Sequence, residues 1–337
     1  MAHADAPMMQ RVRNALNWWE TIETGPTSSI TGRGALAYLE TSFGNLVNDR
    51  LCIALSSGTN ALQVALASVG VGRDDEVICP AYDWPAAAAV VRSLAARPVF
   101  AQVDPETLTI DPVDARRRVT PKTKAIVATH LFGIPADVPA IRRYADHLGL
   151  PVVEDAAQAL GAKLDGAPVG SLGAAAAFSL GPGKLVDCGE GGVATFQHRE
   201  LYEHAMAFSQ HPVRQLLVGL TPQTEGFSAR MPSISAILAA YALGDITREL
   251  GRRLDQFHAV ERAAESSGYQ LIGIDERRRP NWYRIPVRIR NLRTDLTAPT
   301  ASITLARPGI SWLGDIANRG RAGQVRTAHP RLCGGTS

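Results

Sequence analysis

The sequence predicts an α/β protein with a large domain on a mostly parallel sheet and a smaller α/β domain after it. Between residues 50 and 196, short apolar runs alternate with Ala- and Leu-rich stretches, which is the pattern of strands covered by helices. Several runs are apolar throughout, as expected of strands buried on both faces. The alternation ends after residue 197, so we expect a large domain over residues 49–232 and a small one over residues 233–318.

Seven strands account for the apolar runs of the large domain. They are predicted at Leu51–Leu55, Glu76–Cys79, Arg97–Val103, Ala125–Thr129, Pro151–Glu154, Ala174–Leu180 and Gly192–Phe196. Helices that cover this sheet are predicted at Ala61–Val69, Trp84–Leu94 and Pro139–Leu148.

The two ends of the chain have a different pattern. Residues 1–48 read as an N-terminal helical segment, because Val12–Trp19 is amphipathic. In the small domain we expect one long helix over 233–255, a second helix over 256–270 and a strand at Tyr283–Ile289. The tail 319–337 is rich in Arg, Gly and small residues, a composition typical of disordered termini.

Composition excludes several classes of protein. The 337 residues include 35 basic and 32 acidic side chains, and this small excess does not indicate a nucleic-acid-binding protein. The four cysteines lack the spacing of a zinc site or a disulfide scaffold, so we expect no metal and a reducing, cytoplasmic location. No apolar run is long enough to span a membrane, and the N-terminus does not resemble a signal peptide.

Four segments of the sequence carry chemistry. Two of them directly follow predicted strands, namely Leu51–Leu55 and Pro151–Glu154. Ser56–Asn60 leads into a helical stretch, so backbone N–H groups at Gly58 and Thr59 can bind a phosphate. Asp155 follows a strand at the edge where open α/β sheets bind ligands, and its carboxylate can pair with a protonated ring nitrogen. Either segment alone would also fit an ordinary helix cap.

The other two segments contain a lysine and a tryptophan. Lys184 lies in a Gly- and Pro-rich turn, and a deprotonated lysine held there can form an imine with an aldehyde. Ser179, just before this turn, can bind phosphate. Trp84 can stack on a planar ring, although a core position is more typical of tryptophan after a strand. Together the four segments predict a site for pyridoxal 5'-phosphate (PLP) with Lys184 as its attachment point.

The order of these segments resembles the DegT/DnrJ/EryC1/StrS family of sugar aminotransferases, which are fold-type I PLP enzymes. The resemblance covers about residues 50–240. It runs through Ser57–Leu62, Gly72–Pro80, Val99–Asp104, Ile110–Pro112, Thr123–Ile126, His130–Asp137, Glu154–Gln158 and Phe178–Gly192.

The resemblance implies a role for each residue of the site. Lys184 would be the Schiff-base lysine and the proton shuttle, and Asp155 would pair with the pyridine nitrogen. Gln158 would face the ring hydroxyl, and Trp84 would stack on the ring. The residues that would hold the phosphate are Gly58, Thr59 and Ser179.

The resemblance also implies a homodimer with active sites at the subunit interface. Residues 226–231 resemble the family's Gly-x-Asn-x-Arg-Met stretch, which reaches into the partner's site, but Ser228 stands in place of the asparagine. A serine is shorter, so its contact to the cofactor phosphate would be weaker. Gly181-Pro182-Gly183 replace the family's residues before the lysine, and the usual His-Tyr-Pro region is not found.

The implied activity is transfer of an amino group from glutamate or glutamine to a keto-sugar or keto-cyclitol. Two alternatives stay open. The altered Lys184 turn would also suit another PLP reaction, such as dehydration or cyclisation. The chain would otherwise be a non-catalytic regulatory homologue, since a fold does not determine a function, but the retention of Lys184 and Asp155 argues against this. Substrate contacts from His130, Tyr82 and His211 are further candidates, although core or turn roles are more typical.

Overall fold

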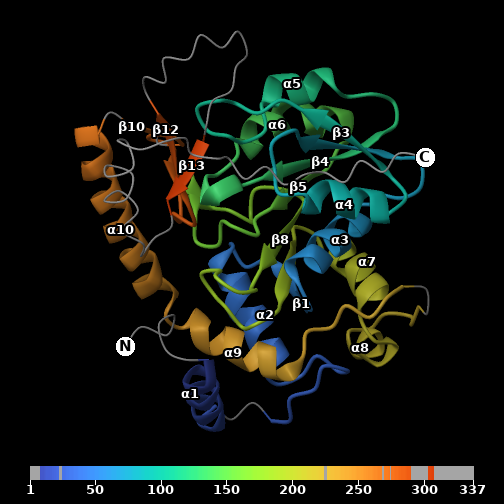
Figure 1. Ribbon diagram of the computed structural model, residues 1–337. Coiled ribbons are helices and arrows are strands. Elements are labelled where there is room, and N and C mark those ends of the chain that lie inside the picture. Colours follow the sequence, from blue (N-terminus) through green and yellow to red (C-terminus); the bar gives the residue numbers. More distant parts are fainter. Residues whose placement is uncertain are drawn as a thin grey trace, which may run out of the picture.

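A seven-stranded sheet forms the centre of the molecule (Figure 1). The computed structural model describes residues 8–22, 25–223, 226–267, 269–273, 275–289 and 303–306. In spatial order the strands are β1 (Leu51–Leu55), β9 (Gly192–Phe196), β8 (Ala175–Ser179), β5 (Val152–Asp155), β4 (Thr123–Thr129), β2 (Glu76–Pro80) and β3 (Arg97–Ala101). Only β9 runs against the others of this sheet, so the predicted mostly parallel sheet is confirmed.

Alternate residues of each strand face two different helical layers. In β1, Cys52 and Ala54 join one apolar core, whereas Ile53 and Leu55 join the core on the opposite face. The first face is covered by α1 (Met8–Glu20), α2 (Ala35–Leu46), α5 (Pro112–Arg117), α6 (Val138–Ala145) and α9 (Ser233–Leu243). The second face is covered by α3 (Gly58–Ser68), α4 (Ala86–Ser93) and α7 (Arg199–Ser209). Helices therefore cover both faces of the sheet, as the strands that are apolar throughout predicted.

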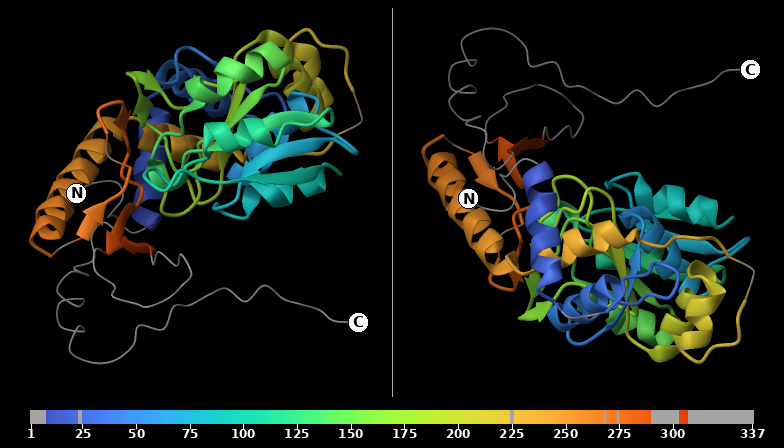
Figure 2. Two further views of the ribbon diagram at one scale, coloured as in Figure 1. Left: turned by 90° about the horizontal axis from the view of Figure 1, so that it is seen from above. Right: turned by 90° about the horizontal axis from the view of Figure 1, so that it is seen from below.

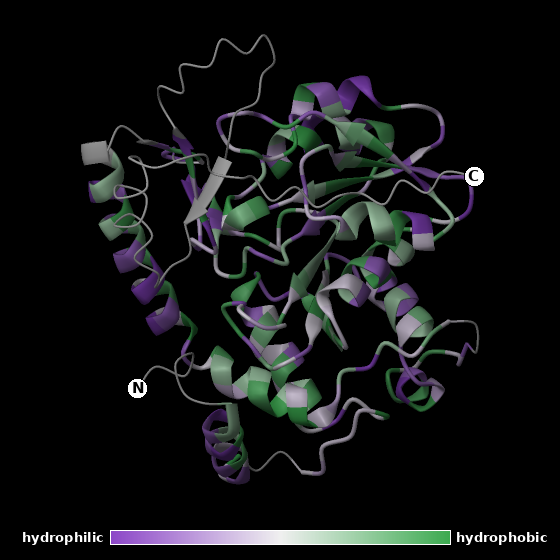
Figure 3. Cartoon of the chain, in the orientation of Figure 1, coloured by the Kyte–Doolittle hydropathy of each residue, from purple (hydrophilic) through white to green (hydrophobic). Residues whose placement is uncertain are grey.

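The predicted boundary between the two C-terminal helices is wrong. The structure has α9 over Ser233–Leu243 and α10 over Ile246–Ser267, with the break at Gly244-Asp245 rather than near residue 255. Asp245 starts the second helix, because its carbonyl accepts the Glu249 N–H at 3.0 Å. The spacing of apolar residues did not reveal this break, because α9 is hydrophobic around most of its surface and has no distinct polar face. The following helix, α10, carries many hydrophilic residues (Figure 3).

The smaller C-terminal region combines α10 with a three-stranded antiparallel sheet, and the two lie together at one end of the molecule (Figure 2). Its strands are β10 (Tyr269–Leu271), β12 (Ile285–Ile289) and β13 (Ile303–Ala306), in the order β10-β12-β13. The strand predicted at 283–289 is confirmed as β12. The predicted tail 319–337 lies outside the described residues.

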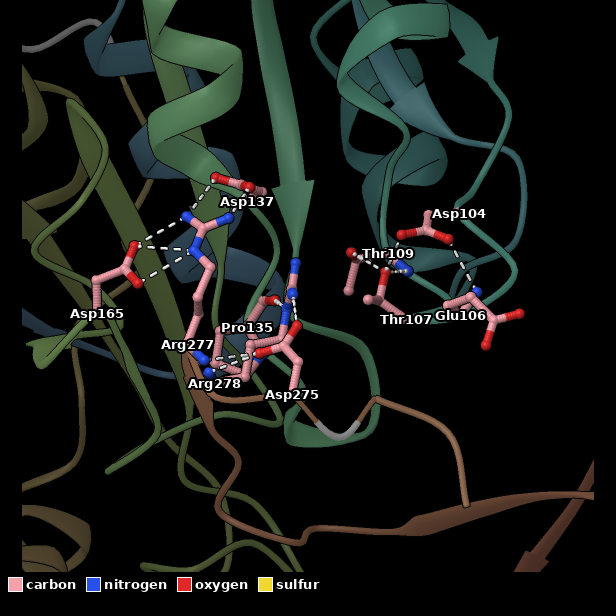
Figure 4. Close-up of polar contacts among 10 residues, drawn as sticks. All are labelled: Asp104, Glu106, Thr107, Thr109, Pro135, Asp137, Asp165, Asp275, Arg277 and Arg278. Atoms are coloured by element: carbon pink, nitrogen blue, oxygen red, sulfur yellow. Dashed lines mark hydrogen bonds and ion pairs between the residues drawn. The ribbon is translucent and has the colours of Figure 1, made fainter. Parts of the chain in front are cut away.

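Polar contacts fix the segment before β12 against the large domain (Figure 4). The Arg277 guanidinium lies between Asp137 and Asp165, with 2.8 Å from Nη2 to Asp165 Oδ2. Next to it, β11 (Arg278–Arg279) pairs with β6 (Lys163–Leu164), and the Arg278 side chain donates to the Pro135 carbonyl at 2.8 Å. These contacts bring residues after 275 to the edge of the central sheet. Within the described parts of the chain, no helix has the length and apolar character needed to cross a membrane.

Candidate active site

A cavity of about 320 Å³ lies where β2, β4, β5 and β8 end. Its walls include seven of the eight residues that the sequence predicted for the site. These are Gly58, Thr59, Trp84, Asp155, Gln158, Ser179 and Lys184. Parallel strands place their carboxyl ends at one edge of a sheet, which explains why segments more than 100 residues apart meet here.

One end of the cavity is the N-terminus of α3. Ser57 caps this helix by accepting the Asn60 N–H at 3.1 Å, which leaves the first turn's N–H groups directed toward the cavity. Gly58 is required by space, since a Cβ there would lie 2.6 Å from the Cβ of Ser179. Free N–H groups, the helix dipole and the Ser179 hydroxyl together make this end suited to a phosphate.

Asp155 closes β5 at the opposite part of the cavity. Burial raises the pKa of its carboxyl, while the Ala157 N–H and the charges of Lys184 and His130 act in the other direction. Asp155 Oδ1 accepts that N–H at 3.1 Å. A buried carboxylate in this place can stabilise a protonated ring nitrogen, which is the role expected of it.

His130 and Glu154 support this edge from the core and do not line the cavity. Both are fully buried, and His130 Nε2 lies 2.9 Å from Glu154 Oε2. Because His130 Nδ1 accepts the Ala136 N–H, Nε2 must be the donor to Glu154. Burial alone would raise the pKa of Glu154, but this hydrogen bond and backbone N–H groups of Gly170 and Gly173 lower it. His130 therefore has the core role rather than a substrate contact.

The turn that carries Lys184 is organised by Asp187. Asp187 accepts the N–H groups of Gly183 at 3.2 Å and Gly189 at 2.9 Å, and its backbone carbonyl accepts the Arg11 guanidinium from α1. Gly183 has a φ of +77°, which a residue with a side chain would adopt only with strain. The glycines that replace the family's usual residues thus form a defined turn that directs Lys184 into the cavity.

Gln158 and Trp84 line the same space with different degrees of exposure. The Gln158 Oε1 atom accepts the Phe132 N–H at 2.7 Å, so its amide nitrogen is left as a donor. This hydrogen bond also fixes Phe132, a non-glycine residue with a φ of +61°. Trp84 is 69% exposed, so it lies at the open side of the cavity and is not a core residue.

Ser228 is the one predicted residue that the structure places elsewhere. It lines a second cavity of about 230 Å³ together with Phe208, His211 and Arg230. Its hydroxyl accepts the Arg230 Nε–H at 2.9 Å. Within one chain, Ser228 and His211 therefore do not join Lys184. His211 instead caps α8 (Pro212–Leu217), since Nδ1 accepts the Val213 N–H at 3.2 Å.

Asp83 and Tyr283 are among the cavity residues that the sequence analysis missed. Asp83 was part of the segment that contains Trp84, but only the tryptophan was given a role. Tyr283 comes from the start of the C-terminal strand region, and the Lys184 Nζ atom lies 4.4 Å from the centre of its ring. Asn281 Oδ1 accepts the Tyr283 N–H at 3.0 Å, and Asn281 Nδ2 donates to the Leu160 carbonyl at 3.0 Å. No sequence signal linked this tyrosine to the lysine.

The donor set of the cavity fits PLP. A helix N-terminus with Ser179 suits the phosphate, the Asp155 carboxylate suits a ring N–H, and an amine at Lys184 suits an aldehyde. Among the described residues, no cluster of His, Cys, Asp and Glu is arranged to hold a metal ion. The sheet and this cavity define a fold-type I PLP protein.

The chain belongs to the DegT/DnrJ/EryC1/StrS aminotransferase family, whose model matches residues 19–304. PLP is the cofactor of this family. The predicted family, fold and cofactor are therefore confirmed, whereas the role of each site residue remains a prediction.

Similar proteins are named as L-glutamine:inosose aminotransferases and as a dTDP-amino-sugar transaminase. An L-glutamine:2-deoxy-scyllo-inosose aminotransferase of Streptoalloteichus tenebrarius is 45% identical over 150 residues, which are 44% of this chain and 35% of the relative. A dTDP-3-amino-3,4,6-trideoxy-alpha-D-glucose transaminase of Streptomyces venezuelae is 36% identical over 202 residues, 60% of this chain and 52% of the relative. The chain spans between about a third and about a half of the length of the curated relatives it matches.

Solved structures support the same family. 3-Amino-5-hydroxybenzoic acid synthase superimposes with a TM-score of 0.74 at 29% identity, covering 83% of this chain and 73% of the other. DesV of S. venezuelae superimposes with a TM-score of 0.72 at 30% identity, covering 84% and 74%.

Proposed function

We propose that the protein is a PLP-dependent aminotransferase that moves an amino group from glutamine or glutamate to a keto-sugar or keto-cyclitol. The observation that carries this proposal is the convergence of Lys184, Asp155 and the α3 N-terminus on one cavity. The relatives named as L-glutamine:inosose aminotransferases support glutamine as the donor and a keto-cyclitol as the acceptor.

The side chains of the cavity have separate tasks in this proposal. When bound, PLP supplies an aldehyde that exchanges between amines and a ring that accepts electrons. Lys184 holds the cofactor through Nζ and afterwards carries the proton removed from the donor's α-carbon. Asp155 holds a proton on the ring nitrogen, and the Gln158 amide donates to the ring oxygen. Trp84 covers one side of the ring. The phosphate is held by Gly58, Thr59 and Ser179.

We propose further that the protein works as a homodimer, in which Ser228 contacts the cofactor phosphate of the partner. Its position outside the Lys184 cavity of its own chain supports this. We also propose that residues 49–232 are the PLP-binding domain and that 1–48 are a helical segment packed on it. Residues 233–318 would be the small domain, whose first helix, α9, packs on the central sheet. Three buried free thiols, Cys52, Cys79 and Cys188, support a cytoplasmic location.

A second candidate is a PLP reaction other than transamination. One observation favours it, namely the structural similarity to 3-amino-5-hydroxybenzoic acid synthase. The two candidates differ in whether an amino donor converts the cofactor to its amine form.

An absorbance spectrum of the purified protein with PLP tests these proposals. The visible band of lysine-bound PLP should form in the protein and be absent in Lys184→Ala. Glutamine or glutamate should then convert this band to the ultraviolet band of pyridoxamine phosphate. A band that no donor alters would favour the second candidate, and a protein without any band would contradict PLP chemistry at Lys184.

A further inference from the structure

Asp83 is a second carboxylate in the Lys184 cavity, and none of the roles above uses it. It follows β2, whereas Asp155 ends β5, and β4 lies between these two strands. Thr129, the last residue of β4, connects them. Its Cα is the register partner of Asp155, and its Oγ1 donates to Asp83 Oδ2 at 2.6 Å. The two carboxyl groups are therefore held on adjacent parts of one sheet edge.

The surroundings of Asp83 hold its side chain in one orientation. Its other oxygen, Oδ1, accepts the Trp84 N–H at 2.7 Å. The backbone of the residue that is proposed to stack on the cofactor ring is thus held by the same carboxylate that accepts from Thr129.

Both carboxyl groups lie in an environment that disfavours their ionised forms. Burial raises the pKa of Asp83 to about 7, and repulsion from the Asp155 carboxylate adds to this effect. Burial also raises the pKa of Asp155. Two carboxylates in one low-dielectric site do not both ionise readily, so protonation of one of them is favoured relative to an isolated aspartate.

Other ionisable groups lie near this pair on the neighbouring elements. Cys79, on β2, is buried, and its burial together with the charges of both carboxylates raises the pKa of its thiol. Lys184 and Glu190 come from the segment between β8 and β9, and Tyr283 comes from the C-terminal region. His130 lies behind Asp155, where its side chain is bonded to Glu154. Lys184 is the one amine among the residues that line the cavity, and it is proposed to be bound to the cofactor.

We propose that Asp83 and Asp155 form a carboxyl pair that retains one proton in the free protein and releases it when a protonated pyridine ring binds. The proposal deepens the proposed function, because it rests on PLP binding at Lys184. In the balanced step, the O–H bond of the pair breaks and its proton passes to solvent. The ring N–H⁺ then compensates the second negative charge, and no electrons are transferred. Asp83 is a positioning residue that couples cofactor affinity to pH.

Binding of pyridoxamine 5'-phosphate to the full chain tests this coupling, since the compound has the ring but no aldehyde for Lys184. A proton that must leave a group with a pKa of about 7 weakens binding roughly tenfold between pH 8 and pH 6. The dissociation constant of the wild type should therefore rise about tenfold more over this range than that of Asp83→Asn. The ionisation of the probe itself is common to both proteins and cancels in the comparison.

Thr129→Val is a matched variant that keeps the Asp83 carboxyl group but should shift the pH dependence of binding instead of removing it. It removes the hydrogen bond that favours the ionised form of Asp83, so the midpoint of the pH dependence should move to higher pH. Parallel pH dependences in the wild type and Asp83→Asn would overturn the proposal.

Carbon-13 NMR of aspartate-labelled protein without cofactor separates this proposal from the proposed function. A carboxyl resonance should titrate near pH 7 in the wild type and be missing in Asp83→Asn. If every aspartate titrates below about pH 5, the pair does not retain a proton and the proposal is wrong. If the titration is present but no cofactor binds, PLP use by this chain fails and the carboxyl pair stands.

Discussion

The two walls of the Lys184 cavity are built in different ways. The wall at the sheet edge is formed by strand ends such as Asp155 and Ser179, and all four residues of β5 are buried. The second wall, called here the C-terminal wall, is formed by Tyr283. This residue belongs to a segment that is held by hydrogen bonds of Asn281 and by ion pairs of the exposed Arg277. Core packing thus fixes the groups assigned to the cofactor, whereas polar contacts fix the group that faces them.

This difference predicts two kinds of mutational effect. Changes at the sheet edge should abolish cofactor chemistry or destabilise the fold, because buried contacts are costly to lose. Changes in the C-terminal wall should alter substrate binding with little effect on stability, because exposed ion pairs contribute little free energy.

The largest expected effect is that of Lys184→Ala. Loss of the amine removes both the covalent attachment and the proton carrier, so turnover should fall by at least about a thousandfold. Steady-state rates with glutamine and a keto-cyclitol measure this. Lys163→Ala, which alters an exposed lysine on β6 outside the cavity, is the matched control and should keep wild-type rates. Turnover retained in Lys184→Ala would show that the chemistry does not use this wall.

Glu154→Gln should be the most destabilising change at the sheet edge. Glu154 accepts hydrogen bonds from His130 and from the N–H groups of Gly170, Leu172 and Gly173, and an amide cannot accept all of them. We expect a loss of about 3 kcal/mol in the free energy of unfolding, measured with urea at pH 7.

The pH dependence of this effect has a defined sign. The pKa of Glu154 is lowered in the folded protein, so its stabilisation is present above the unfolded value of about 4.3 and is lost as pH falls through the folded value. The difference between wild type and variant should therefore shrink in acid. Glu106→Gln, a change in an exposed carboxylate paired with Arg288, should alter stability by less than about 1 kcal/mol. An equal loss in both variants would contradict the contrast between the walls.

Tyr283→Ala should affect substrate binding more than stability. The ring lies 4.4 Å from Lys184 Nζ and forms part of the cavity, so its removal should raise the KM for one substrate about tenfold. Tyr283→Phe keeps the ring and should remain near wild type. Steady-state kinetics of both variants decide between ring packing and a role for the hydroxyl. A larger loss in Tyr283→Phe than expected would assign the effect to the hydroxyl group.

Arg277→Met should have the smallest effect. The Arg277 side chain is 42% exposed, so its contacts to Asp137 and Asp165 should contribute less than about 1 kcal/mol to the free energy of unfolding. If these contacts position Tyr283, the variant should raise the same KM by a smaller factor. In the Tyr283→Ala background, Arg277→Met should not raise the KM any further, and a double-mutant cycle measures this. Full additivity would show that the Arg277 contacts and the tyrosine act independently.

Local patterns in the sequence determined much of this protein. The apolar runs predicted the sheet, and the Gly-rich turn around Lys184 and the strand end at Asp155 predicted both cofactor groups. These features are encoded locally, because a buried strand must be apolar and a strand-to-helix turn requires particular residues over a few positions. Family membership and the cofactor could therefore be predicted from the order of these local segments along the chain.

Only the tertiary structure decided which distant segments meet. It placed Tyr283 beside Lys184, brought Asp83 and Asp155 into one cavity, separated Ser228 from the cavity of its own chain, and ended α9 at Leu243. Such contacts depend on strand order and on how the C-terminal region docks, and neither leaves a periodic signal in the chain. Strand order brings β2, β4 and β5 together at one edge, and this is why the pKa of Asp83 depends on Thr129 and Asp155, which lie far from it along the chain.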